Sequence, residues 1–250
     1  MVQGSVRRLE TRVISSIAAF ILAGCSTGYN RGEIDTALRS EKRVYASSEQ
    51  SVEEIEQMKP QLKLPARIAI APPVQTLQTY GRGDLLQTWS PQEVAVLDSW
   101  AEPLRVAGIA EDLLILPNML VKECDFQDIG CRLKAQRAAA AHVHADALLI
   151  LNLATSTDEY ANPASVLYIT IIGIWFVPGT HRDALTVAEG LLLDNRNEYL
   201  YAFARGEGEE KSVRPIAYAD TRAVVHASRV EALKKFGVVF LEQARQLHPK

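Results

Sequence analysis

The sequence has little cysteine and no large excess of charge of either sign. Three cysteines in 250 residues exclude a small disulfide-rich protein, and 14 glycines with 11 prolines exclude collagen and low-complexity chains. The net charge of −3 lacks the basic excess of a nucleic-acid-binding domain, so we expect no nucleic acid partner. With 48% hydrophobic residues, the composition is that of a globular protein, and the length suits one large domain.

Compact catalytic motifs are also missing. The sequence contains no Gly-x-Ser-x-Gly, His-Glu-x-x-His, P-loop or Gly-x-Gly-x-x-Gly pattern. His142 and His144 would lie about 200° apart around a helix and would not share an ion. The stretch 206–210, Gly-Glu-Gly-Glu-Glu, lacks the alternating ligands of an EF-hand and is interpreted as a solvated turn. We therefore predict no catalytic residue, no metal and no cofactor.

Residues 1–24 have the pattern of an export signal. Three arginines lie between residues 7 and 12, and an uncharged run follows over residues 13–24. This run is shorter than the about 20 residues that a membrane-spanning helix needs. It ends in Leu22-Ala23-Gly24-Cys25, which resembles the bacterial lipobox. The resemblance implies that the signal is removed and that Cys25 carries acyl chains such as palmitate. An ordinary signal peptide with a chance cysteine is the alternative.

A polar segment follows the lipobox. Ser26 stands where an Asp would favour retention in the inner membrane of enterobacteria, so we predict a lipoprotein of the outer membrane with its domain in the periplasm. Two or three acyl chains anchor a protein stably, since each buried CH₂ contributes about 0.8 kcal/mol. Residues 25–62 are interpreted as a lipid-anchored tether, with short helical pieces near 34–45 and 52–58. Stretched, it would reach about 120 Å.

The remainder, residues 63–250, is predicted to form one α/β domain of two or three layers. A capping box at Ser90-Pro91-Gln92-Glu93 begins the first helix, which Gly108 ends. Further helices are expected at 128–145 and 220–247, a polar loop at 74–89, and strands at 67–71, 112–121, 146–155, 168–177, 186–194 and 198–205. The order β-α-β-α-β-β-β-β-α favours a mixed sheet covered by about three helices.

Several stretches of this domain resemble a known family. The segments LPARIAIAPP, ADALLILNLAT, GIWFVPGTH and GLLLDNRNEYLYAFARGEGE resemble the rhombotail lipoproteins of Gram-negative bacteria. More distantly, the order of elements is similar to the periplasmic domains of the curli-secretion lipoprotein, the penicillin-binding-protein activator lipoproteins and the amino-terminal domain of TolB. Some rhombotail members end in a tail cut by a rhomboid-like protease. This chain ends LEQARQLHPK, so we expect no such processing.

Cys124 and Cys131 are the cysteines that remain once Cys25 is acylated. They lie seven positions apart at a junction between a predicted strand and a predicted helix. In the oxidising periplasm such a pair closes a small loop, which would contribute about 2–3 kcal/mol. We therefore predict a disulfide. Two buried free thiols are the alternative.

The most apolar segment after the signal is Tyr168–Val177, YITIIGIWFV, which we predict to be a strand. Side chains alternate along a strand, so Trp175 and Phe176 would point to opposite faces. We expect Phe176 to face the helices together with Ile172, and Trp175 to lie on the other face with Ile169. The two aromatic side chains then either complete the core or form the rim of a partner site.

These features favour a non-enzymatic outer-membrane lipoprotein that binds another component of the cell envelope. One alternative is a secretion or pore component similar to the curli-secretion lipoprotein, which would require amphipathic membrane strands. A second alternative is an envelope hydrolase, which would require a nucleophile and a base. The partner is expected to be an envelope protein, with the membrane itself bound through Cys25.

Overall fold

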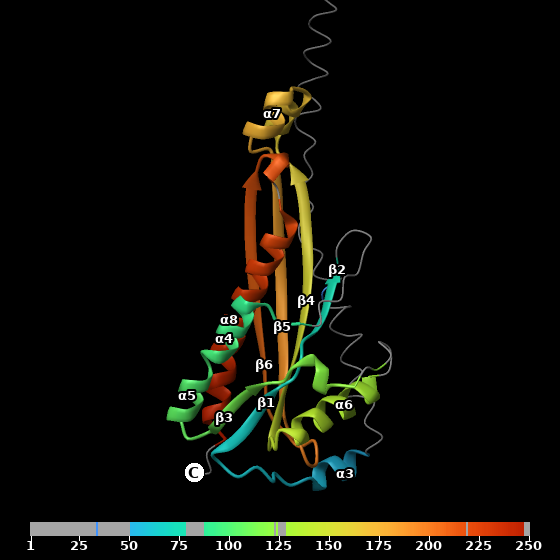
Figure 1. The fold of residues 1–250 in the computed structure, drawn as a ribbon, viewed down its shortest axis with the longest axis vertical. Coiled ribbons are helices and arrows are strands. Elements are labelled where there is room, and N and C mark those ends of the chain that lie inside the picture. Colours follow the sequence, from blue (N-terminus) through green and yellow to red (C-terminus); the bar gives the residue numbers. More distant parts are fainter. Residues whose placement is uncertain are drawn as a thin grey trace, which may run out of the picture.

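A computed structural model describes residues 34, 51–78, 88–122, 124, 129–218 and 220–247. These residues form one mixed six-stranded sheet with helices on both faces (Figure 1). The strands are β1 Ala66–Ile70, β2 Val74–Gln78, β3 Ala110–Ile115, β4 Ala147–Ala161, β5 Thr180–Asp194 and β6 Leu200–Arg214. The helices are α3 Val52–Gln57, α4 Pro91–Asp98, α5 Ala101–Val106, α6 Ile129–His142, α7 Ile171–Phe176 and α8 Thr221–Arg245, with 3₁₀ turns η1 Asn118–Leu120, η2 Pro163–Ile169 and η3 Ile216–Tyr218. The predicted α/β class is confirmed.

Three long antiparallel strands dominate the sheet. Its order is β3-β1-β4-β5-β6, and β2 pairs with a further part of β4. Strand β1 pairs in parallel with the start of β4, and β2 pairs in parallel with Asn152–Ser156. Strands β4, β5 and β6 therefore continue well beyond β1 and β3, and the molecule is elongated (Figure 1). The prediction of a loop over residues 74–89 is wrong for Val74–Gln78, which form β2. The sequence of β2 is mostly polar, and it becomes a strand by pairing with β4.

The long helix α8 lies directly on β5 and β6, where two glycines allow the close approach. A Cβ atom at Gly206 would lie 2.2 Å from the backbone nitrogen of Phe236, and one at Gly208 would lie 2.1 Å from the carbonyl oxygen of Ser228. The turn predicted over 206–210 is therefore wrong. These residues lie within β6, and their glycines serve helix packing and not chain reversal.

The first predicted helix is two helices in the structure. Ser90 and Glu93 form the predicted capping box, in which the Glu93 backbone nitrogen donates to Ser90 Oγ at 3.3 Å and the Ser90 nitrogen donates to Glu93 Oε2 at 2.8 Å. The helix is interrupted before α5, whose first turn contains Pro103. Proline lacks an N–H and its ring clashes with the preceding helical turn, so it is tolerated only where a helix begins. The interruption places Trp100 against Phe236, with ring centroids 5.6 Å apart.

The β5–β6 hairpin agrees with the predicted hairpin but is longer. Arg137 of α6 holds its turn, since Nη2 donates to the carbonyl oxygens of Asn195 and Arg196 at 2.9 Å each, and Nη1 pairs with Glu198. On this second face of the sheet, α6 packs small side chains such as Ala139 and Ala140 over β1 and β4. The strand predicted to run to residue 121 instead ends with β3, and η1 follows.

The end of the predicted tether is attached to the base of the domain. The helical piece expected near residues 52–58 is confirmed as α3. The backbone nitrogens of Gln61 and Leu62 donate to the Tyr201 hydroxyl at 2.9 and 2.8 Å, and that hydroxyl donates to Asp194 Oδ2 at 2.7 Å. Burial, reinforced by the hydrogen bond to Asp194, raises the pKa of Tyr201 to about 12.

A second attachment lies far earlier in the chain. Ile34 is helical and only 2% exposed, and it packs with Ala154, Leu185 and Val187. These three side chains belong to β4 and β5, so Ile34 covers the sheet beside its long strands. Residues 1–24 and Cys25 lie outside the described residues.

Candidate interaction site at the tip of the sheet

The structure places Trp175 and Phe176 on the short helix α7 and not on a strand. The segment between β4 and β5 forms η2 and α7, so the strand predicted over Tyr168–Val177 is wrong. The expected placement of the two aromatic side chains on opposite faces of a sheet is wrong with it. Strands β4 and β5 pair up to the last residue of β4, Ala161, which lies opposite the first residue of β5, Thr180. The apolar segment therefore projects beyond the sheet.

Two caps explain why this segment turns instead of extending. Asn162 Oδ1 accepts a hydrogen bond from the Ala164 nitrogen at 2.9 Å, and Pro163 begins η2. Thr170 Oγ1 accepts from the Gly173 nitrogen at 3.0 Å and begins α7. A Cβ atom at Gly173 would lie 1.9 Å from the carbonyl oxygen of Leu167, so this turn requires glycine. The Asn-Pro pair and the Thr-x-x-Gly spacing are signals that sequence reasoning could have used.

Tyr168 connects the two ends of the segment that forms η2 and α7. Its hydroxyl donates to the carbonyl oxygen of Val177 at 3.1 Å and accepts from the Gly179 nitrogen at 2.9 Å. The same oxygen lies 3.0 Å from Thr180 Oγ1. Tyr168 thus joins η2 to the strand that follows α7, which makes the segment a compact unit.

We call the surface of η2, α7 and η3 the apolar tip. It lies at the far end of the long strands (Figure 1). Trp175 is 48% exposed and Phe176 77% exposed, and the Trp175 ring meets Tyr218 edge-on at 5.7 Å. Residues 161–180 contain no charged side chain. Exposed apolar patches of this kind mark interaction sites. The exposed large apolar side chains of the tip are Val166, Leu167, Ile169, Ile172, Trp175, Phe176, Ile216 and Tyr218.

A polar cluster lies below the tip, where β4 and β5 end. Tyr160 stacks on His181 with ring centroids 4.6 Å apart, and the Tyr160 hydroxyl donates to Asp183 Oδ2 at 3.3 Å. Asp183 is buried, and its Oδ1 has no hydrogen-bond partner among the described residues. Burial raises the pKa of Asp183, against the opposing effects of the Tyr160 hydroxyl and of Lys211.

Replacing Asp183 by Asn is expected to raise the Tm at pH 8. Because the folded protein holds the Asp183 proton more tightly than the unfolded chain, this carboxyl favours folding below its ordinary pKa of 3.8. That contribution is lost as the pH rises through the raised pKa, so the gain from Asn should shrink toward pH 4. Thermal unfolding at pH 8 and pH 4 measures the change in Tm. Asp98→Asn, at an exposed position, is the control. A lower Tm than wild type at pH 8 would contradict the expectation.

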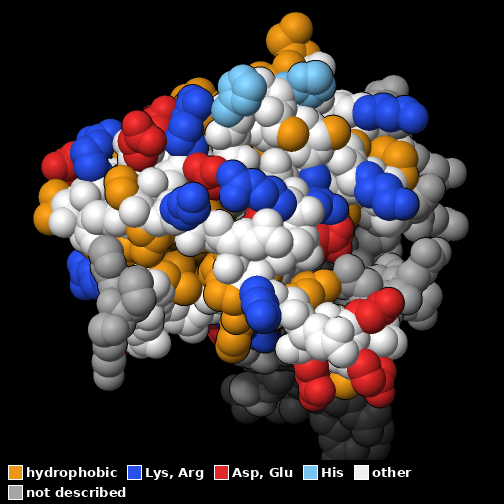
Figure 2. All heavy atoms as spheres, turned by 90° about the horizontal axis from the view of Figure 1, so that it is seen from below, with side chains coloured by type: hydrophobic (Ala, Val, Ile, Leu, Met, Phe, Trp, Pro, Cys, Tyr) orange, Lys and Arg blue, Asp and Glu red, His pale blue; other side chains and the backbone are white. Residues whose placement is uncertain are grey.

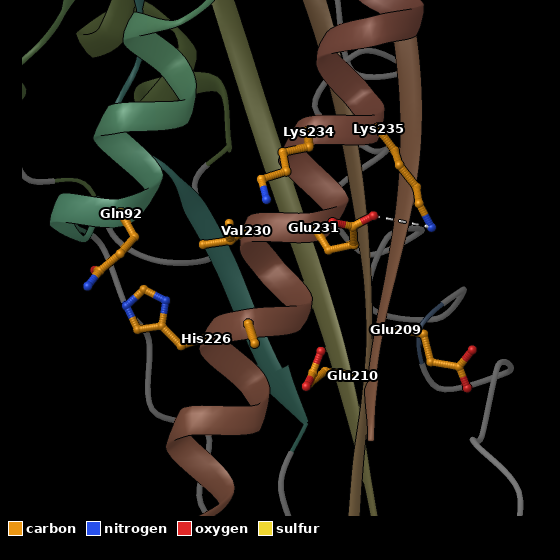
Figure 3. Close-up of a pocket in the computed structure, with 9 residues that line it drawn as sticks. Gln92, Glu209, Glu210, His226, Val230, Glu231, Lys234 and Lys235 are labelled. Carbon is orange, nitrogen blue, oxygen red and sulfur yellow. Dashed lines mark ion pairs between the residues drawn. The ribbon is translucent and has the colours of Figure 1, made fainter. Parts of the chain in front are cut away.

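Two open grooves lie on the surface of the described residues. One, of about 770 Å³, lies along the outer side of α8 between α4 and β6 (Figure 3). His226 lies beside Gln92 there, and Glu231 pairs with Lys235 at 3.8 Å. Within the part of the chain that the structure describes, His226 forms no hydrogen bond with a carboxylate or hydroxyl. The groove is a solvated surface lined mainly by polar and charged side chains of α4, α8 and β6.

The second groove lies beside the cysteine pair. Cys124 and Cys131 are joined by a disulfide with the sulfur atoms 2.02 Å and the Cα atoms 5.9 Å apart, as their spacing predicted. Lys134 and His142 of α6 line the groove with Cys131, and its volume is about 700 Å³. Among the described residues, no group of three or more His, Cys, Asp or Glu side chains is arranged to hold a metal ion.

Comparisons with known proteins find only distant similarity. No protein-family model matches the sequence, and no curated protein matches it. The PelC dodecamer from Paraburkholderia phytofirmans is similar at 15% identity, covering 76% of this chain and 94% of that chain, with a TM-score of 0.32. Lipoprotein GNA1162 from Neisseria meningitidis is similar at 17% identity, covering 64% and 90%, with a TM-score of 0.33. A putative neuraminyllactose-binding hemagglutinin homolog from Helicobacter pylori is similar at 8% identity, covering 77% and 88%, with a TM-score of 0.34.

The names of these structures include neither the rhombotail nor the curli-secretion lipoproteins, so that resemblance stays a prediction. In the described residues, no helix has both the length and the apolar character needed to cross a membrane.

Proposed function

We propose that this protein is a lipid-anchored, non-enzymatic binding module of the bacterial outer membrane, with its α/β domain in the periplasm. The observation that carries the proposal is the apolar tip, where Trp175 and Phe176 are exposed at the end of three long strands. A large apolar surface in water is unfavourable, and it is retained where it binds another component. The sheet and α8 serve as the support that presents it.

The support below the tip is built for rigidity. Strands β4, β5 and β6 each contain 15 residues, and α8 packs along β5 and β6 through Ala232, Phe236 and their neighbours. Tyr168 ties the tip to the start of β5. A binding surface held by such fixed elements loses little conformational entropy when it engages its target.

The remaining observations favour a binding role in the envelope. A disulfide between Cys124 and Cys131 fits an oxidising compartment such as the periplasm. The lipobox that ends at Cys25 supplies a membrane anchor. The grooves carry scattered surface charges in place of a nucleophile with its base, which favours binding over catalysis.

Replacing Cys25 by Ser is expected to abolish acylation and to release the domain from the outer membrane fraction. The thiol is the nucleophilic group that accepts the acylated glycerol, and Ser does not replace it in the lipobox. Mass spectrometry of the wild-type amino-terminal peptide should show acyl glycerol on Cys25. Ser26→Asp is the matched control, because it should leave acylation intact and move the protein to the inner membrane. A Cys25→Ser protein that remains with the outer membrane would contradict the proposal.

A further inference from the structure

We infer that the apolar tip inserts into the phospholipid surface of the same membrane that holds the acylated Cys25. The inference rests on the proposed function and names the component that the tip binds. The protein would then be attached at two points, by its acyl chains and by η2, α7 and η3.

The chemistry of the tip suits a bilayer interface. Neither residues 161–180 nor η3 contains a charged side chain, and the nearest charges beside η3 are Arg214 and Asp220. Insertion of the apolar tip alone, with Arg214 and Asp220 left at the interface, would therefore desolvate no ionised side chain. Backbone groups in hydrocarbon need partners within the protein, and here the caps of Asn162 and Thr170 and the Tyr168 hydroxyl supply them. Trp175 and Tyr218 meet at the edge of the tip, and Trp and Tyr are the side chains enriched where a membrane meets water.

The reach of the anchor agrees with this placement. Ile34 packs on the sheet at Leu185, and eight residues lie between it and Cys25, so the nine steps from Ile34 to Cys25 span at most about 32 Å. Leu185 lies five residues from Thr180, the tip end of β5, or about 17 Å along the strand. The helices of the tip beyond Thr180 add about 10–12 Å, the diameter of one helix, to the distance from Leu185. Cys25 and the apolar tip can therefore lie in one membrane plane.

The opposite end of the sheet lies farther from the contact between Ile34 and Leu185. Asp194, the last residue of β5, is about 31 Å from Leu185 along the strand, and the hairpin turn lies beyond it. That end is also charged. It carries the pairs Arg137–Glu198 and Arg196–Asp146, and Figure 2 shows lysine, arginine and acidic side chains spread over it. A charged surface of this kind stays in water, so the asymmetry assigns the uncharged end to the lipid.

Two attachments on one short connection strengthen each other, because the acyl anchor keeps the tip at a high effective concentration near the bilayer. A domain held in this way stands with its long strands rising from the membrane. Its charged end then points away from the membrane into the periplasm.

Quenching of tryptophan fluorescence by brominated phospholipid tests the inference. Full-length acylated protein is reconstituted in vesicles of phosphatidylethanolamine and phosphatidylglycerol with brominated acyl chains. Of the three tryptophans, Trp100 is buried in the core and Trp89 is partly buried against that core, away from the tip. Quenching of the wild type should therefore come mainly from Trp175, and Trp175→Phe should lose most of it. Trp175→Phe keeps an apolar side chain at the tip and removes only the reporter. Equal quenching of the two proteins, or none in either, would overturn the inference.

A matched pair of substitutions tests the tip itself. Phe176→Ser removes a 77% exposed aromatic from α7, whereas Phe203→Ser removes a 63% exposed aromatic from β6, on the sheet away from the tip. The first should reduce the bromolipid quenching of Trp175, and the second should leave it unchanged. Equal effects of the two would count against insertion by the tip.

Crosslinking separates lipid from a protein partner. A photoreactive amino acid at position 176 in growing cells should yield adducts with phospholipid. Adducts with a single envelope protein instead would overturn the membrane inference and leave the proposed binding module standing. Failure of the purified protein to carry acyl chains or to enter vesicles would count against the proposed function itself, whatever Trp175 reports.

Discussion

Replacing Glu93 by Gln is expected to lower the free energy of unfolding by about 3–5 kcal/mol. The side chains of Glu93 and Arg229 are 0% and 5% exposed, and Oε1 lies 2.6 Å from Nη2 as an ion pair without the alignment of a hydrogen bond. Burial lowers the pKa of Arg229, because the interior disfavours its charge, and Glu93 opposes that effect. Gln retains an oxygen for the capping box with Ser90. It removes the countercharge, so the guanidinium is left buried and unbalanced.

Urea denaturation measures the loss in free energy of unfolding caused by Glu93→Gln. Two further variants show whether the loss comes from the unbalanced charge. Glu93→Gln combined with Arg229→Met removes both charges and should recover most of the loss, since an apolar pair of similar size is often as stable as a buried ion pair. Glu102→Gln breaks the exposed Glu102–Arg105 pair on α5 and should cost less than about 0.5 kcal/mol. A loss below about 1 kcal/mol for Glu93→Gln would contradict the expectation.

Replacing Gly206 by Val is expected to lower the free energy of unfolding by about 3 kcal/mol or to prevent folding. The new Cβ would lie 2.2 Å from the Phe236 nitrogen and 2.5 Å from the Ala232 carbonyl oxygen. Both atoms belong to the backbone of α8, so no side-chain rotation relieves the clash. The helix would have to move away from β6 and expose the apolar side chains between them.

The control for this variant is Glu209→Val. It introduces the same side chain into the same strand, at an exposed position, and should change the free energy by less than about 0.5 kcal/mol. Thermal or chemical unfolding of both proteins makes the comparison. Similar stability of Gly206→Val and Glu209→Val would show that α8 does not depend on the glycine at position 206.

Local signals account for what could be predicted from the sequence. The Ser90–Glu93 capping box is complete within four residues, and the spacing of Cys124 and Cys131 allows a disulfide without reference to the rest of the fold. The hairpin of β5 and β6 and the helix α8 have strong periodic patterns of their own. Long-range contacts explain what was missed. The two glycines of β6 suggest a turn until α8 is placed upon them, and β2 is a strand only beside β4.

The sequence alone determined the export pattern, the α/β class and the most apolar segment, Tyr168–Val177. Only the tertiary structure decided where that segment lies. A ten-residue segment as apolar as this one forms a buried strand when a sheet offers it a neighbour on each side. Here β4 and β5 already pair with each other along their whole length. The segment is left outside the sheet, where its caps fold it into short helices and Trp175 and Phe176 face outward. Composition fixed how apolar the segment is, whereas strand pairing, a contact between distant parts of the chain, fixed its exposure.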